Sequence, residues 1–184
     1  MQQSNHDWHF RVAILGSAGT GKTCLMRALL GESFPSEVGY RATLGAERAV
    51  MEGIANGESV AVELTSLPGA YSRLPLTQLH LGAKPEAVIV TYAVNNVETF
   101  KETVFWVNEA SRMSPGCLIV LVGTLVDTKV ASVNGADALV QAKEWGGRAY
   151  TVSSKTGRGI DEFKKAFLLD IVREKGHVAA KTLD

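Results

Sequence analysis

The sequence contains few cysteines and no excess of charge of either sign, and both shortages limit the kind of protein that it encodes. Cys24 and Cys117 are the two cysteines among 184 residues, and no C-x-x-C or Cys/His spacing accompanies them. The pattern therefore does not indicate a zinc site, and we expect two reduced, buried thiols in an intracellular protein. The formal net charge is +0, which gives no electrostatic case for nucleic acid or an anionic membrane as the main partner.

Long apolar runs and targeting signals are also missing. No apolar run reaches the length of about 18 residues that is needed to span a bilayer. The N-terminus, MQQSNHDWHF, lacks the layout of a signal peptide and the glycine required for myristoylation, and the C-terminal KTLD has no nearby cysteine for prenylation. We therefore expect a cytoplasmic protein without a direct lipid anchor.

What remains is an ordinary globular composition, with 46% hydrophobic and 21% charged residues. The length suits one domain with a full core, and we find no internal repeat, linker or low-complexity tract. We predict a single domain over residues 1–184, with its core at about 10–174 and terminal extensions at 1–9 and 175–184.

Strand-like and helix-like segments alternate along the chain. The predicted strands are 10–15, 48–54, 58–64, 87–92, 117–122 and 148–152, and the predicted helices are 21–30, one that begins after Asn95 or Asn96, 136–145 and 160–173. Asn56-Gly57 is suited to a tight hairpin turn. Continuous apolar strands separated by helices indicate a mostly parallel sheet that is covered on both faces. We predict an α/β fold with a mixed six-stranded sheet and one antiparallel edge pair, in which ligands bind at the carboxyl ends of the strands.

Two of the predicted helices have an apolar face. In the helix after Asn95 or Asn96 that face consists of Phe100, Val104, Val107 and Ala110, and in the last helix it consists of Ile160, Phe163, Phe167 and Ile171.

The segment after the first predicted strand matches the phosphate-loop pattern G-x-x-x-x-G-K-[ST]. Its residues are Gly16, Ser17, Ala18, Gly19, Thr20, Gly21, Lys22 and Thr23, and our nucleotide-binding prediction adds Cys24. Glycines let backbone N–H groups surround phosphates, and the start of the following helix favours an anion. Lys22 is expected to reach the outer phosphates and Thr23 to bind Mg²⁺. The motif alone does not distinguish guanine from adenine.

With this loop, the chain resembles the Ras superfamily of small GTPases, most of all its Rab-like members, from about residue 10 to residue 169. The resemblance implies the small G-protein fold and binding of GTP or GDP with Mg²⁺. It implies that Phe34 covers the guanine, although an ordinary core or surface role for Phe34 stays open. Residues 41–47 resemble the first switch, in which Thr43 senses the outer phosphate and Mg²⁺. The loop between Thr23 and Thr43 is about two residues longer than the family pattern.

Two later segments resemble the elements that read guanine. Thr124 and Asp127 stand in the N/T-K-x-D element, where an aspartate accepts two hydrogen bonds from guanine that adenine cannot offer. Leu125 replaces the usual lysine of this element. Ser153, Ser154 and Lys155 resemble the (T)SAK element. A turn or helix-capping aspartate and an ordinary serine-rich turn are the alternative interpretations.

The second switch departs from the family pattern D-x-x-G-Q. Ser66 stands in place of the aspartate that holds Mg²⁺ through water, and Ala70 in place of the glutamine that orients the attacking water. Gly69 is present, and we expect its N–H to contact the third phosphate of a bound nucleotide. Ala18 adds a methyl group beside the expected third phosphate. We therefore predict no catalytic residue of the usual kind and slow or absent hydrolysis.

Large apolar residues follow in the same region. They are Leu67, Tyr71, Leu74, Leu76 and Leu79, with Pro68 and Pro75 among them. Core packing is one interpretation, and a docking surface for a partner is the other. We expect an effector or complex subunit to bind near residues 41–47 and 66–79.

These patterns predict an atypical GTP-binding protein that acts as a binding module in vesicle or intraflagellar transport. It would be found in the cytoplasm, and at cilia, flagella or trafficking membranes through its partners. A working GTPase that uses residues supplied by a partner and a nucleotide-free scaffold are the alternatives. An adenine-specific enzyme conflicts with Asp127.

Overall fold

The computed structural model describes residues 6–34, 45–69 and 83–180, with side chains as far as Gly176. Its strands are β1 (Trp8–Gly16), β2 (Glu47–Ala55), β3 (Glu58–Ser66), β4 (Ala87–Ala93), β5 (Leu118–Thr124) and β6 (Arg148–Thr151). Its helices are α1 (Lys22–Leu29), α2 (Val97–Lys101), α3 (Thr103–Met113), α4 (Gly135–Glu144) and α5 (Ile160–Ala180).

The strands form one six-stranded sheet in the order β2-β3-β1-β4-β5-β6. All neighbouring pairs are parallel except β2 and β3, which are antiparallel. The predicted mixed, mostly parallel sheet is therefore confirmed. Asn56 and Gly57 join β2 to β3 with φ angles of 53° and 85°, the left-handed conformation that a tight hairpin turn requires.

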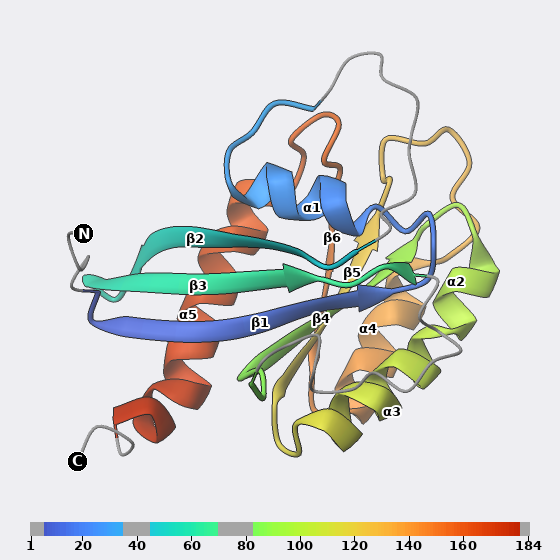
Figure 1. Cartoon of the computed structure of the whole chain (residues 1–184). Coiled ribbons are helices and arrows are strands. Elements are labelled where there is room, and N and C mark those ends of the chain that lie inside the picture. Colours follow the sequence, from blue (N-terminus) through green and yellow to red (C-terminus); the bar gives the residue numbers. More distant parts are fainter. Residues whose placement is uncertain (1–5, 35–44, 70–82, 181–184) are drawn as a thin grey trace.

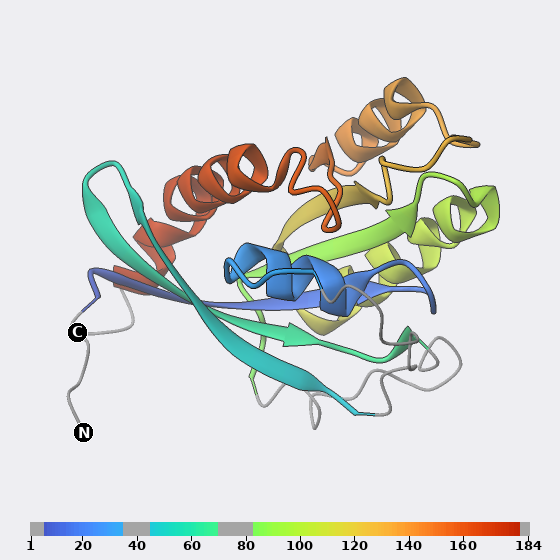
Figure 2. The same cartoon turned by 90° about the horizontal axis from the view of Figure 1, so that it is seen from above.

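Helices cover both faces of the sheet (Figures 1 and 2). On one face, α1 and α5 pack against the side chains of β1 that point that way, Phe10, Val12 and Ile14. On the other face, α3 and α4 pack against the alternate residues Ala13 and Leu15. Alternate side chains of a strand point to opposite faces, so a continuous apolar run supplies both halves of the core.

The apolar face predicted for the last helix is confirmed, because Ile160, Phe163, Phe167 and Ile171 are all buried. The face predicted for the helix after Asn96 is partly wrong. Asn96 does cap the segment, since its side chain accepts a hydrogen bond from the Glu98 N–H. The segment is divided at Glu102 into α2 and α3, and Val104 is 44% exposed.

The buried face of α3 contains larger and more polar residues than expected. They are Thr103, Trp106, Val107, Ala110 and Met113. Val107 and Ala110 were predicted for this face and are buried, whereas Thr103, Trp106 and Met113 extend it and Val104 lies outside it. The cysteine prediction also needs correction, because Cys24 and Cys117 are half-buried instead of buried.

The start of β1 and the last turns of α5 lie together at the end of the sheet away from the β1–α1 loop (Figure 1). The rings of Trp8 and Phe10 are stacked, with their centroids 6.2 Å apart. A Cβ atom on Gly176 of α5 would lie 3.2 Å from the Trp8 ring. The glycine therefore makes room for the indole ring.

The hydroxyl group of Tyr92 generates a prediction for stability. It is buried and has no hydrogen-bond partner among the described residues, and burial raises the pKa of Tyr92 to about 12. A buried polar group without a partner costs about 1–3 kcal/mol, so Tyr92→Phe should leave the free energy of unfolding unchanged or raise it by about 1 kcal/mol.

Tyr150→Phe is the matched control, because the Tyr150 hydroxyl donates to Asp170 Oδ2 at 3.1 Å. This control should lose about 1 kcal/mol. Urea unfolding at neutral pH measures both values. Equal losses in the two variants would show that the Tyr92 hydroxyl is satisfied in solution.

Candidate nucleotide-binding site

The segments predicted to bind nucleotide meet at one edge of the sheet. The β1–α1 loop leaves the carboxyl end of β1, while Asp127 and Ser153 follow the carboxyl ends of β5 and β6. These strands are parallel, so their carboxyl ends meet at the same edge (Figure 1). This is where open α/β sheets bind ligands.

The loop between β1 and α1 depends on its glycines. Gly16, Gly19 and Gly21 have φ angles of 142°, 77° and 75°, a region that other residues seldom adopt. A Cβ atom on Gly16 would also overlap the Thr91 side chain. No side chain caps the start of α1, and the positive end of that helix dipole favours an anion.

Lys22 lies inside this loop and is 7% exposed. Its Nζ donates to the carbonyl oxygens of Gly16 at 2.8 Å and Ser17 at 2.7 Å. Burial lowers the pKa of Lys22 to about 8, because the low-dielectric surroundings disfavour the charged form. The ammonium group therefore lies within the phosphate loop, where two backbone carbonyls hold it.

Buried hydroxyl groups connect the loop to the sheet. Thr20 Oγ1 donates to the Ser17 carbonyl at 2.9 Å and lies 2.7 Å from Thr91 Oγ1. Thr124 Oγ1 lies within hydrogen-bond distance of two carbonyl oxygens, 2.8 Å from Thr20 O and 3.0 Å from Tyr92 O. The sequence reasoning assigned Thr20 and Thr124 to the site but missed Thr91, because no motif marks it.

The two guanine-reading segments are brought together. Ser153 Oγ donates to Asp127 Oδ1 at 2.6 Å, and Ser153 Oγ also accepts a hydrogen bond from the Thr156 N–H at 3.1 Å. Ser153 is fully buried, while Asp127 stays exposed at the edge. An exposed carboxylate that is held by a buried serine is suited to accept hydrogen bonds from a ligand.

The remaining predicted base contacts lie nearer to solvent. Lys155 is exposed, Ser154 is half-buried, and Phe34 is 38% exposed. Leu125 is partly exposed and has a φ of 62°, which is unusual for a leucine. These positions are compatible with packing over a base.

The structure adds two residues that the sequence reasoning did not assign to the site. Ser17 Oγ donates to the carboxylate of Glu102, and Trp106 Nε1 donates to Ser17 Oγ at 3.2 Å. Glu102 and Trp106 come from the junction of α2 with α3 and from α3 itself. They lie more than 80 residues from the loop in sequence, and no spacing pattern indicated the contact.

Comparison with known proteins agrees with this geometry. The Ras family model matches residues 11–173. The chain belongs to the Ras family. The Ras-related protein Rab-30 of Homo sapiens is 30% identical over 128 residues, which are 69% of this chain and 62% of that protein.

More distant Rab proteins align over more of the chain. The probable Ras-related protein Rab-4A of Echinococcus multilocularis is 26% identical over 165 residues, 88% of this chain and 73% of that protein. The Ras-related protein RABD2b of Arabidopsis thaliana is 26% identical over 161 residues, 85% of this chain and 77% of that protein. The Rab-like resemblance is thereby confirmed, although the chain spans less than two thirds of the length of the Rab-30 protein.

The segment predicted to be the second switch is described only as far as Gly69, and Ala70 and Thr43 lie outside the described residues. Ser66 is buried at the end of β3. Gly69 lies directly against the loop, because a Cβ atom there would overlap the backbone of Ser17 and Ala18. No residue larger than glycine fits this position without displacing the loop.

The residues at this edge fit a bound Mg²⁺ in part. Mg²⁺ usually binds one or two protein oxygens together with phosphate and water oxygens, and Thr23 at the start of α1 carries one such oxygen. Ser66 offers a hydroxyl where the family has a carboxylate, and a neutral hydroxyl is a weaker ligand. No group of three or more His, Cys, Asp or Glu side chains able to hold a metal occurs among the described residues.

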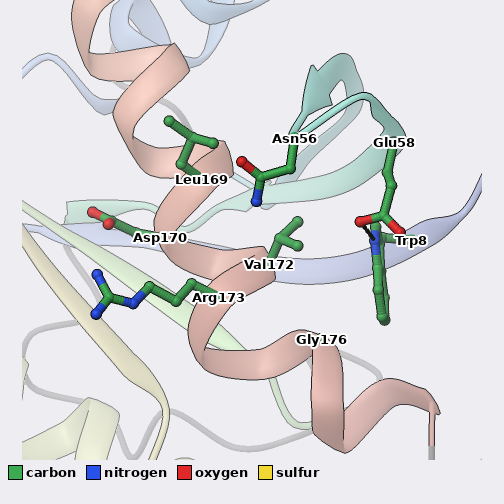
Figure 3. Close-up of a pocket in the computed structure, with 8 residues that line it drawn as sticks. All are labelled: Trp8, Asn56, Glu58, Leu169, Asp170, Val172, Arg173 and Gly176. Atoms are coloured by element: carbon green, nitrogen blue, oxygen red, sulfur yellow. Dashed lines mark hydrogen bonds between the residues drawn. The ribbon is translucent and has the colours of Figure 1, made fainter.

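A groove of about 600 Å³ lies at the opposite end of the molecule. It is lined by Trp8, Asn56, Glu58, Leu169, Asp170, Val172, Arg173 and Gly176 (Figure 3). Its polar groups are largely engaged, since Trp8 Nε1 donates to Glu58 at 2.8 Å and Asp170 pairs with Arg148 at 3.1 Å. The groove contains no residue predicted to bind nucleotide.

In the described ranges, no helix is both long and apolar enough to cross a membrane.

The lowered pKa of Lys22 generates a prediction of pH dependence. The folded value of about 8 lies below the reference value of 10.5, so the cost of burying the charge is present below pH 8 and is relieved as the pH rises toward 10.5. From about pH 7.5 to about pH 9.5, the nucleotide-free protein should gain about 2 kcal/mol of stability relative to Lys22→Met.

Urea unfolding of the two proteins at both pH values measures this difference. Saturating GDP should abolish the relative gain, because phosphate charges favour the protonated lysine. Parallel pH profiles for the two nucleotide-free proteins would show that Lys22 keeps an ordinary pKa.

Proposed function

We propose that this Ras-family protein is an atypical GTP-binding protein with weak or absent intrinsic hydrolysis. It binds GTP or GDP with Mg²⁺ and acts as a nucleotide-dependent binding module in vesicle or intraflagellar transport. The observation that carries the proposal is the meeting of Lys22, Asp127 and Ser153 at one sheet edge, while Ser66 and Ala70 replace the usual hydrolytic residues.

Nothing in the packing of the fold requires these polar residues together. Lys22 is buried at a cost that its low pKa reflects, and Asp127 is an exposed carboxylate whose serine partner comes from another loop. A guanine nucleotide explains both, since its phosphates neutralise the lysine and its base donates hydrogen bonds to the aspartate. Adenine offers that carboxylate no such pair of donors.

Hydrolysis is expected to be the weakest part of this chemistry. Phosphoryl transfer depends on positioning and on stabilising charge, and an intact Ras protein turns over only about 10⁻⁴ times per second unaided. Ala70 has no polar group to orient water, and Ser66 carries no charge to help retain Mg²⁺. Slow or absent turnover follows for the isolated protein.

The site of action is part of the same proposal. The whole chain acts as one domain in the cytoplasm, and an effector or complex subunit docks near residues 41–47 and 66–79. That partner brings the protein to trafficking membranes or to a cilium or flagellum. Two rival functions remain: a working GTPase that uses residues from a partner, and a scaffold that binds no nucleotide.

The first experiment is to denature the purified protein and chromatograph the released nucleotide. We expect a stoichiometric guanine nucleotide, with GTP present because hydrolysis is slow. GDP alone would favour the working GTPase. A protein that is empty and also fails to bind added GTP with Mg²⁺ would leave only the scaffold.

Restoring the family residues provides a second prediction. Ser66→Asp combined with Ala70→Gln should raise single-turnover hydrolysis toward about 10⁻⁴ per second, since the variant regains a ligand for the Mg²⁺-bound water and a group that orients the attacking water. Ser66→Asn with Ala70→Met is the control of similar volume and should remain slow. If both variants stay as slow as the natural protein, the defect lies elsewhere in the site.

A further inference from the structure

The second residue of the phosphate loop, Ser17, forms hydrogen bonds with residues that belong to none of the predicted nucleotide-binding segments. Ser17 is 7% exposed, and its hydroxyl group lies between the Glu102 carboxylate and the indole of Trp106, which is 1% exposed. An indole N–H only donates, and an ionised carboxylate only accepts. The direction is therefore fixed: Trp106 donates to Ser17 Oγ, and the Ser17 hydroxyl donates to Glu102.

The carbonyl group of the same residue holds the functional side chain of the loop. Ser17 O accepts hydrogen bonds from Lys22 Nζ at 2.7 Å and from Thr20 Oγ1 at 2.9 Å. Ser17 thus connects two parts of the molecule. Its side chain contacts the start of α3, and its backbone carbonyl holds Lys22. A displacement of Ser17 would displace the Lys22 acceptor as well.

We infer that Glu102 and Trp106 are positioning residues for the phosphate-binding loop. The inference rests on the proposed nucleotide binding and adds the residues that set how strongly the phosphate chain is held. Their hydrogen bonds order the loop before ligand arrives, so that less conformational entropy is lost on binding. The hydrogen bond to Glu102 is the stronger contribution, because its acceptor is ionised.

The fold itself does not depend on this contact. The loop is connected separately to the sheet through Thr20, Thr91 and Thr124, and Glu102 is an exposed residue. Removing the Glu102 carboxylate should therefore leave the protein folded while the loop loses its outer restraint. This separates a positioning role from a purely structural one.

The test compares Glu102→Ala and Ser17→Ala with the control Glu109→Ala. The control removes a carboxylate of α3 that forms an ion pair with Arg112 and, among the described residues, has no hydrogen bond to the phosphate loop. Competition against fluorescent GDP measures affinity for GDP and for GMP, which lacks the outer phosphate. We expect about tenfold weaker GDP binding in both test variants, the loss of one charge-assisted hydrogen bond. The affinity for GMP should change less than about twofold, because GMP lacks the outer phosphate that Lys22 is expected to hold. A change of that size is within the margin expected for independent sites.

Two further variants sharpen the assignment. The Glu102→Ala/Ser17→Ala double variant should bind GDP no more weakly than Ser17→Ala alone, because Ser17→Ala already removes the bond to Glu102. Glu102→Gln keeps an acceptor oxygen and should recover most of the GDP affinity. Equal losses for GDP and GMP, or additive losses in the double variant, would overturn the inference.

Hydrogen exchange of the nucleotide-free protein tests the same contact without any ligand. Amide exchange in a peptide spanning residues 16–21 should accelerate in Glu102→Ala and Ser17→Ala, but not in Glu109→Ala. The melting temperature of Glu102→Ala should stay unchanged. Faster exchange in the test variants would support the positioning role even if the natural protein bound no nucleotide. The absence of nucleotide binding would refute only the proposed function. Unchanged exchange in the test variants would overturn the positioning role.

Discussion

The carbonyl oxygen of Ser17 is the acceptor on which the phosphate loop depends. A buried ammonium group needs hydrogen-bond partners, and Lys22 finds two of them in the backbone of its own loop. The left-handed glycines allow the chain to turn tightly enough for those carbonyls to face the lysine. The form of the loop is therefore set by the need to solvate one charge, and a phosphate chain would relieve that need.

Buried hydroxyl groups connect the predicted base-reading segment to the phosphate loop. Leu125 cannot link the base-reading segment to the phosphate loop through a polar group, but Thr124 lies 2.8 Å from the Thr20 carbonyl. Thr20 in turn meets Thr91 at the end of β4. Short hydroxyl side chains on adjacent parallel strands hold the two halves of the site in register, with little side-chain entropy to lose.

The sequence was informative wherever one local pattern determines structure. Apolar runs marked the strands of the sheet, Asn56-Gly57 marked the hairpin, and the phosphate-loop motif marked the glycine-rich loop between β1 and α1. Prediction failed where distant segments meet. Helical spacing cannot show that α2 ends at Lys101 and that Val104, in the separate helix α3, is exposed. No motif pairs Ser17 with Trp106, since that contact depends on how α3 sits against the sheet.

The contact between Trp8 and Gly176 has a practical consequence for handling the protein. Glycine inside a helix costs roughly 1 kcal/mol relative to alanine, yet here it admits the indole ring and brings the start of β1 against α5. The start of β1 and the last turns of α5 therefore lie on the side opposite the phosphate loop (Figure 1). A fluorescent label on an exposed side chain of this part of α5 would lie on the side away from the phosphate loop and leave the candidate site open to solution.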